Sequence, residues 1–118
     1  MITSIAFTVY PVSDMARSRR FYENVLGLRT EHAFGDQWVE YDVGGSTFAI
    51  TTTDMGHPPG AKGAVVAFET TDLDAAVRRL KEQSVPVVVE TFSTPVCRMV
   101  VIEDPDENHV TIHQRHQG

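Results

Sequence analysis

The last apolar stretch of the chain carries three polar residues with the clearest chemical potential. His109, Thr111 and His113 alternate with hydrophobic residues, so they should share one face of a strand over residues 109–114. Imidazole exchanges protons near neutral pH and is the commonest metal ligand. Two histidines four residues apart are separated by about 13 Å of strand, which is long for joint binding of one ion. We interpret Thr111 and His113 as polar residues of a ligand cavity, with plain exposure on an end strand as the alternative for His113. For His109, exposure on the end strand is the preferred interpretation.

Trp38 and Glu40 are further candidates, and both lie in a segment that is predicted to be a strand over residues 37–43. A single tryptophan usually belongs to the core. In a cavity it would instead offer a flat stacking wall. Glu40 is either solvated or, if it faces the same cavity, an acceptor for a cationic or hydroxyl-bearing ligand.

Cys97 and Arg98 are neighbours in the strand expected over residues 96–102, so they should point to opposite faces. One of them should face the cavity, and we assign that place to Arg98. Cys97 has no histidine or carboxylate paired with it, and it is interpreted as a small hydrophobic residue rather than a nucleophile. No nucleophile elbow, phosphate-binding glycine loop or dinucleotide motif is present.

Composition limits the class of protein. The chain has 118 residues, of which 42% are hydrophobic and 22% charged, with one cysteine and a net charge of −6. These values fit one globular unit in a reducing compartment, and we expect a cytoplasmic protein. No run of apolar residues is long enough for a membrane span, and no signal peptide is expected. The acidic balance argues against a nucleic-acid partner and favours cationic or neutral small ligands.

Two amphipathic helices and eight strands must position these residues. The first helix is predicted to begin at Ser13-Asp14, where both residues are good N-caps, and to end at Gly27. The second should begin at Thr71-Asp72 and end near Gln83-Ser84. Alternating or turn-bounded apolar segments predict strands over residues 5–10, 28–34, 37–43, 47–53, 64–69, 86–91, 96–102 and 109–114.

The order of strand, helix and three strands occurs twice. Residues 14–20 align with residues 72–78, and the same offset aligns Ile5-Ala6-Phe7 with Gly63-Ala64-Val65. Such a repeat predicts an α+β protein with two βαβββ modules, 1–53 and 63–118, joined by a linker over 54–62 within one domain of residues 1–118. Neither module can bury both its sheet face and its helix alone, so the sheets should enclose a shared cavity.

Three motifs carry a family resemblance that covers essentially the whole chain. In residues 12–28 an aspartate opens the helix, the aromatic pair Phe21-Tyr22 lies inside it, and Leu-Gly-Leu ends it. Residues 66–76 and the turn at 104–108 follow in the same order. Together they resemble the vicinal oxygen chelate superfamily of glyoxalase, bleomycin-resistance and dioxygenase proteins. Glu107 stands where that family commonly has glycine, and a positive φ there would cost roughly 1 kcal/mol.

The resemblance implies cup-shaped mixed sheets, a homodimer, and one divalent metal held by His and Glu residues on the first and last strands of each module. The matching positions here are Phe7, a residue within 47–51, Val65 and Thr111. None of these offers an imidazole or a carboxylate, so we expect neither a metal nor another cofactor. A different ligand set that uses His109, His113 or Glu40 stays an alternative.

Two functions of different class follow. The first is a metal-free protein that binds a small aromatic or cationic molecule in the cup. The second is a lyase, isomerase or dioxygenase with displaced metal ligands, or with His113 or Glu40 as general base. We favour binding, with no nucleic-acid or membrane partner. The expected ligand-binding residues are Phe7, Trp38, Glu40, Arg98, Thr111 and His113.

Overall fold

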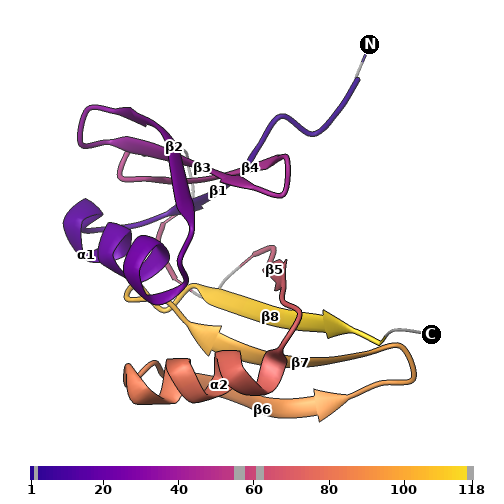
Figure 1. The fold of residues 1–118 in the computed structure, drawn as a ribbon. Coiled ribbons are helices and arrows are strands. Elements are labelled where there is room, and N and C mark those ends of the chain that lie inside the picture. Colours follow the sequence, from indigo (N-terminus) through magenta and orange to yellow (C-terminus); the bar gives the residue numbers. More distant parts are fainter. Residues whose placement is uncertain (2, 55–57, 61–62, 117–118) are drawn as a thin grey trace. The chain divides into compact units, whose positions relative to one another are not determined.

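The computed structural model describes residues 1, 3–54, 58–60 and 63–116 and divides the chain into two compact units, Met1–Pro59 and Gly60–Gly118 (Figure 1). Each unit consists of a strand, a helical segment and three further strands, with its four strands in one mixed sheet. The predicted α+β fold with two βαβββ modules is therefore confirmed. Part of the predicted linker, residues 54–62, lies outside the described residues.

The sheet of the first unit has the strand order β1-β4-β3-β2. β1 pairs with β4 in parallel, while β3 is antiparallel to both of its neighbours. The parallel ladder starts with Thr8 opposite Phe48, so the first strand begins later than residue 5, where the sequence predicted it. The elements are β1 (Thr8–Pro11), α1 (Met15–Arg19), η1 (Arg20–Val25), β2 (Arg29–Phe34), β3 (Trp38–Val43) and β4 (Ser46–Thr51).

The helical segment of this unit begins and ends where its local signals predict. The Asp14 side chain accepts a hydrogen bond from the backbone N–H of Arg17 at 3.0 Å, as an N-cap does. Gly27 adopts a φ of +75° just past the end, a conformation that glycine tolerates best. The second half, η1, was not predicted. It is a π-helical turn, in which the N–H of Leu26 donates to the carbonyl of Phe21 at 3.0 Å.

Aromatic rings form the core between this helical segment and the sheet. The ring of Tyr22, which is 0% exposed, lies 5.2 Å from that of Phe48 and 6.3 Å from that of Tyr41, measured between centroids. Phe48 also makes an edge contact with Tyr10 at 5.4 Å. These contacts show which face of the sheet the helical segment covers, since Tyr41 and Phe48 point toward it.

A half-buried polar cluster lies beside this core. Glu23 of η1 accepts hydrogen bonds from the Tyr41 hydroxyl at 2.9 Å and from Arg19 Nε at 2.6 Å. Burial alone would raise the pKa of Glu23, but the hydrogen bonds from Arg19 and Tyr41 and the charge of Arg19 hold it below its ordinary value. Burial, and then the hydrogen bond to Glu23, raise the pKa of Tyr41. The phenol therefore stays protonated and donates.

We expect Glu23→Gln to lower the free energy of unfolding at pH 7 by about 1–2 kcal/mol, because a charged acceptor becomes neutral. A carboxylate whose folded pKa is depressed stabilises the fold above its unfolded pKa, here the ordinary value of 4.5. That contribution is lost as the pH falls through the lower folded pKa. Urea titrations from pH 7 to pH 3 should show a shallower acid loss for the variant. Glu31→Gln, at an exposed position, is the control. Equal acid curves for Glu23→Gln and wild type would contradict the assignment.

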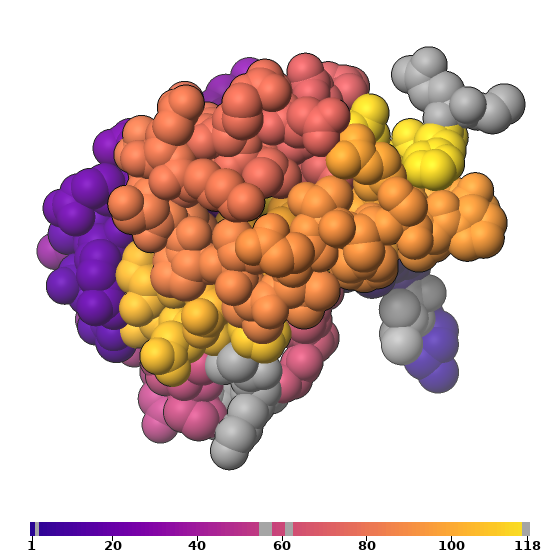
Figure 2. All heavy atoms as spheres, turned by 90° about the horizontal axis from the view of Figure 1, so that it is seen from below, coloured from indigo at the N-terminus to yellow at the C-terminus, as the bar shows by residue number. Residues whose placement is uncertain are grey.

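The second unit repeats this plan with the strand order β5-β8-β7-β6. Its helix begins at Asp72, whose side chain accepts from the N–H of Ala75 at 3.0 Å, and Gln114 of β8 accepts from the N–H of Leu73 at 2.9 Å. Figure 2 shows α2 and β6 side by side, where Lys81 Nζ lies 3.6 Å from a Glu90 carboxylate oxygen. The elements are β5 (Val66–Glu69), α2 (Leu73–Glu82), β6 (Val87–Ser93), β7 (Cys97–Glu103) and β8 (His109–Arg115).

In the described part of the chain, neither helical segment has the length and hydrophobicity of a membrane span.

The turn before β8 is closed by the buried side chains of Asp104 and Asn108. Asp104 Oδ1 accepts from the N–H groups of Asp106 and Asn108, at 2.9 and 2.8 Å. Asn108 Oδ1 accepts from the N–H of Gly60 at 2.9 Å, which ties the start of the unit to this turn. Glu107 has a φ of +66°, so a residue with a Cβ adopts here the left-handed conformation that glycine tolerates best.

Glu107→Gly should raise the free energy of unfolding by about 0.5–1 kcal/mol. The substitution removes the left-handed strain of a residue with a Cβ, and the greater freedom of glycine in the unfolded chain offsets part of that gain. Glu107→Ala is the matched control, because it removes the carboxylate and keeps the strain. Chemical denaturation of the three proteins checks this. If alanine stabilises as much as glycine, charge and not backbone conformation is the cause.

Candidate functional site

Each sheet has one face covered by its own helical segment and a second face, which we call the distal face. In β3, Val39 and Tyr41 are fully buried, and Tyr41 contacts η1. Because side chains alternate along a strand, Trp38 and Glu40 lie on the distal face of the first sheet. Both are half-buried. Both residues therefore lie on a face that the helical segment of this unit leaves uncovered.

Phe7, Trp38 and Glu40 form one contact cluster on that face. The Phe7 ring meets the Trp38 ring edge to face, with centroids 5.2 Å apart and an interplanar angle of 90°. The indole N–H of Trp38 donates to Glu40 Oε2 at 3.0 Å. Phe7, directly before β1, remains 39% exposed. The indole is thus held from two sides, and the carboxylate beside it retains further acceptor positions.

Two neighbours of this cluster were not anticipated as site residues. Cross-strand pairing places His32 of β2 opposite Glu40, and Phe34 opposite Trp38. Directly paired residues share a face of the sheet, so both belong to the distal face. Phe34 is 58% exposed, and its ring lies 5.9 Å from that of His32. Their spacing of two residues is consistent with a shared face of β2. Only the strand register shows that this face also carries Trp38 and Glu40.

The distal face of the second sheet carries Thr111 and His113. Thr111 lies between Ala67 of β5 and Val101 of β7 and is 8% exposed, so it offers little surface to a ligand. His113 Nδ1 lies 2.5 Å from Glu69 Oε1, and the His113 side chain is 21% exposed. Glu69 was not predicted as a site residue. It is 44 residues earlier in the chain and reaches His113 through the parallel pairing of β5 with β8.

The expectation for Arg98 is corrected by its contacts. Arg98 Nη2 donates to Asp74 of α2 at 2.9 Å, so the side chain lies on the helix-covered face of the second sheet. Thr111 and His113 lie on the other face. Cys97 is buried, with its sulfur 3.1 Å from the Thr94 hydroxyl. Alternation was predicted correctly, but the wrong member of the pair was given to the cavity, because Asp74 supplies an ion pair that strand periodicity cannot reveal.

The residues at the metal positions implied by the family do not fit a metal. Phe7 presents a ring packed against Trp38, and Thr111 is a buried hydroxyl between two aliphatic residues. The side chain of Val65 has no atom that could bind a metal. Among residues 1, 3–54, 58–60 and 63–116, no three His, Cys, Asp or Glu side chains lie close enough to hold an ion. Of the suggested replacement ligands, Glu40 belongs to the first unit, and His109 and His113 belong to the second.

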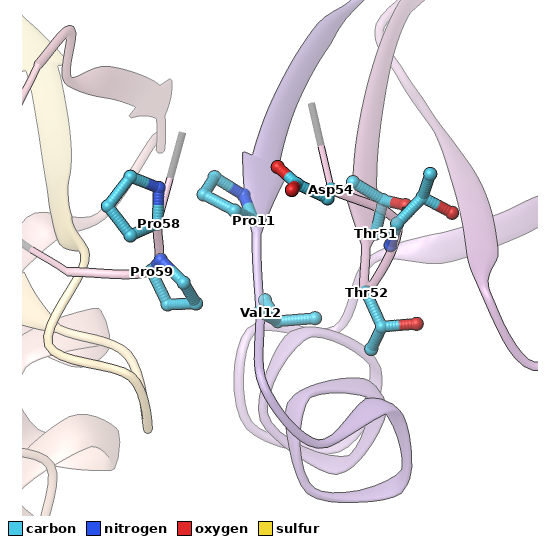
Figure 3. A pocket seen from close by; sticks show the side chains of 8 residues that line it. Pro11, Val12, Thr51, Thr52, Asp54, Pro58 and Pro59 are labelled. Atoms are coloured by element: carbon cyan, nitrogen blue, oxygen red, sulfur yellow. The ribbon is translucent and has the colours of Figure 1, made fainter. Parts of the chain in front are cut away.

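A separate pocket of about 530 Å³ lies at the end of the first sheet (Figure 3). Proline and threonine side chains dominate it, and among the described residues that line it Asp54 is the one with an ionisable side chain. None of the predicted ligand-binding residues contributes to it. The lining residues are Pro11, Val12, Thr51, Thr52, Thr53, Asp54, Pro58 and Pro59.

Comparison with protein families matches residues 4–112 to the model of the Glyoxalase/Bleomycin resistance protein/Dioxygenase superfamily. The chain also resembles a solved antibiotic binding protein, TnmS3, from Streptomyces sp. CB03234, with 26% identity, a TM-score of 0.80 and 98% of each chain covered. A glyoxalase/bleomycin resistance protein from the same organism has 27% identity and a TM-score of 0.78, with 94% of this chain and 100% of that chain covered.

A solved enzyme has a similar fold. A lactoylglutathione lyase from Agrobacterium tumefaciens has a TM-score of 0.76 over 97% of this chain and 95% of that chain, at 20% identity. That likeness is one of fold alone. The comparison with curated proteins found no match.

Proposed function

The chain belongs to the Glyoxalase/Bleomycin resistance protein/Dioxygenase superfamily, and from that premise we propose that it binds a small aromatic or cationic molecule without a metal ion. The site is the cluster of Phe7, Trp38 and Glu40 on the distal face of the first sheet. The observation that carries the proposal is the way Trp38 is held. An edge contact from Phe7 and a hydrogen bond to Glu40 orient the indole before any ligand arrives.

Preorganisation of this kind favours binding, because the ligand need not order the side chain. An aromatic ligand would stack on the indole, and a cation would gain from both the ring and the neighbouring carboxylate. The exposed ring of Phe34 extends the aromatic surface along the same face. The likeness to an antibiotic binding protein at 26% identity supports a small organic ligand over an inorganic one.

The direct test is a screen of small aromatic and cationic compounds that uses the fluorescence of Trp38, the one tryptophan of the chain. We expect saturable quenching or a spectral shift with at least one class. Isothermal titration calorimetry confirms stoichiometry. If binding persists unchanged when Phe7 and Glu40 are both replaced by alanine, the site lies elsewhere. A hit that is turned over chemically would favour the alternative of an enzyme.

Divalent metals are expected to leave the melting temperature unchanged. A ligand that binds only the folded state must stabilise it, and at 100-fold excess over its Kd the gain is about 2.7 kcal/mol. Differential scanning fluorimetry with Ni²⁺, Zn²⁺, Mn²⁺ and Fe²⁺ checks this, with elemental analysis of protein purified without chelators or an affinity tag. Stoichiometric metal, or a clear rise in melting temperature, would contradict the metal-free proposal and make His109, His113 and Glu40 the first residues to mutate.

A homodimer is also proposed. Large hydrophobic side chains are exposed in both units, including Ile5 at 87% and Val96 at 69%. Covering such side chains with a second chain would remove apolar surface from water, which is favourable. Light scattering at high micromolar concentration should give twice the chain mass. A monomer mass there would count against the dimer and leave the ligand site untouched.

A further inference from the structure

Glu69 and His113 form a fixed pair on the distal face of the second sheet. Glu69 Oε1 lies 2.5 Å from His113 Nδ1, and Glu69 Oε2 accepts the backbone N–H of Arg115 at 2.7 Å. Both carboxylate oxygens are therefore engaged, one by the imidazole and one by the main chain of the strand that carries it. The second bond keeps the carboxylate from rotating away from His113.

The contacts of Glu69 decide the tautomer of His113. The backbone N–H of Arg115, and then the hydrogen bond from His113, hold the pKa of Glu69 below its usual range. Glu69 is thus an ionised acceptor at neutral pH and must receive a proton from its partner. In the neutral imidazole, Nδ1 then carries the hydrogen and Nε2 keeps the lone pair.

Glu69, His113, Met99 and Phe92 form a row of neighbouring residues across the four strands of the second sheet. Beyond His113, on the side away from Glu69, the members of this row are apolar. Met99 of β7 is paired with His113, and Phe92 of β6 is paired with Met99. Paired residues share a face, so the ring of Phe92, which is 41% exposed, lies along the same row as the imidazole. The charged residues next to His113 on this face are Glu69 and Arg115. Met99, its neighbour on β7, has no ionisable group.

We propose that this row is a binding site for a hydroxyl-bearing aromatic or enolic molecule, with His113 as its proton acceptor and Glu69 as the residue that positions His113. The apolar part of the ligand covers Met99 and Phe92, and its hydroxyl donates to His113 Nε2. Transfer breaks the ligand O–H bond, forms the Nε2–H bond and leaves the electron pair on oxygen. The resulting imidazolium is paired with Glu69, and the ligand is bound as its anion.

This site lies within the second unit and does not depend on the ligand site proposed on the first sheet. Its chemistry also differs, since it selects for an acidic hydroxyl rather than for a cation. A plain exposed Glu–His ion pair would contribute little to stability and would show no preference among ligands. A ligand site and a plain ion pair therefore make different predictions for the ring tautomer of His113 and for ionisation of the ligand.

The test uses the full chain and two readouts. ¹⁵N NMR of the imidazole should show the Nδ1–H tautomer of neutral His113 in the wild type and a loss of that preference in Glu69→Gln. 4-Nitrophenol, whose anion has a distinct visible absorption band, should bind the wild type with an increase of that band. His113→Gln should abolish the increase, and Glu69→Gln should weaken binding at least about tenfold, as the loss of a charge-assisted hydrogen bond implies. Glu90→Gln is the matched charge control and should behave as wild type.

4-Nitroanisole, which has no hydroxyl, separates proton acceptance from apolar contact. It should bind at least about tenfold more weakly than 4-nitrophenol and equally to all variants. An Nε2–H tautomer in the wild type would overturn the proposal. So would a wild type that produces no phenolate band, or a His113→Gln protein that produces the same band as wild type.

Discussion

Replacing Trp38 with alanine is expected to weaken binding of the tightest compound from the fluorescence screen by roughly 30-fold or more. Truncation of a central aromatic residue in a binding site typically costs about 2 kcal/mol or more, which corresponds to that factor. Trp38 stands at the centre of its cluster, with the Phe7 ring 5.2 Å away and Glu40 accepting its N–H. Because the variant has no tryptophan, affinity must be measured by calorimetry.

Trp38→Phe is the matched control for this change. It keeps an aromatic surface and removes the hydrogen bond to Glu40, so its affinity should fall between those of wild type and alanine variant. Circular dichroism of each protein shows whether the sheet is intact. An alanine variant that is folded and binds within about twofold of wild type would rule out the indole as the ligand surface.

Replacing Tyr22 with alanine is expected to lower the free energy of unfolding by about 3–5 kcal/mol, the usual cost of removing a buried aromatic ring. Tyr22 is 0% exposed, and its ring contacts those of Phe21, Tyr41 and Phe48. Since domains are stable by only about 5–15 kcal/mol, this loss could remove most of the stability. Denaturant titration followed by circular dichroism measures it.

Two controls separate ring burial from other effects of changing Tyr22. Tyr22→Phe keeps the ring and should cost much less than alanine. Phe34→Ala removes a ring of similar size that is 58% exposed, and should cost less than about 1 kcal/mol. A Tyr22→Ala protein that unfolds within 1 kcal/mol of wild type would mean that the aromatic contacts between η1 and the sheet are not the main core of this unit.

Features encoded over a few neighbouring residues could be predicted from the sequence. Asp14 and Asp72 cap the helices because a short acidic side chain bonds to an N–H three residues ahead, and Gly27 ends the first helix because it tolerates a φ of +75°. The repeat of strand, helix and three strands follows from the same local signals. The π-helical turn of η1 was missed, because its hydrogen-bond shift leaves no mark in apolar spacing.

In the candidate sites too, features set by neighbouring residues could be predicted, and features set by tertiary packing could not. Alternation correctly placed Cys97 opposite Arg98, because successive side chains in a strand point to opposite faces. Periodicity does not say which face a helix will cover. Arg98 was assigned to the cavity, whereas its ion pair with Asp74 lies on the side of α2.

The absence of imidazole or carboxylate at Phe7, Val65 and Thr111 can be read directly from the chain, since a residue's chemistry is local. The pairing of Glu69 with His113 cannot, because these residues are 44 positions apart and meet only when β5 and β8 align in parallel. Strand pairing is set by the burial of whole faces and by long-range register, not by the residues that it brings together. Local rules therefore yield the modules and their candidate groups, while the assembled sheets determine which of those groups touch.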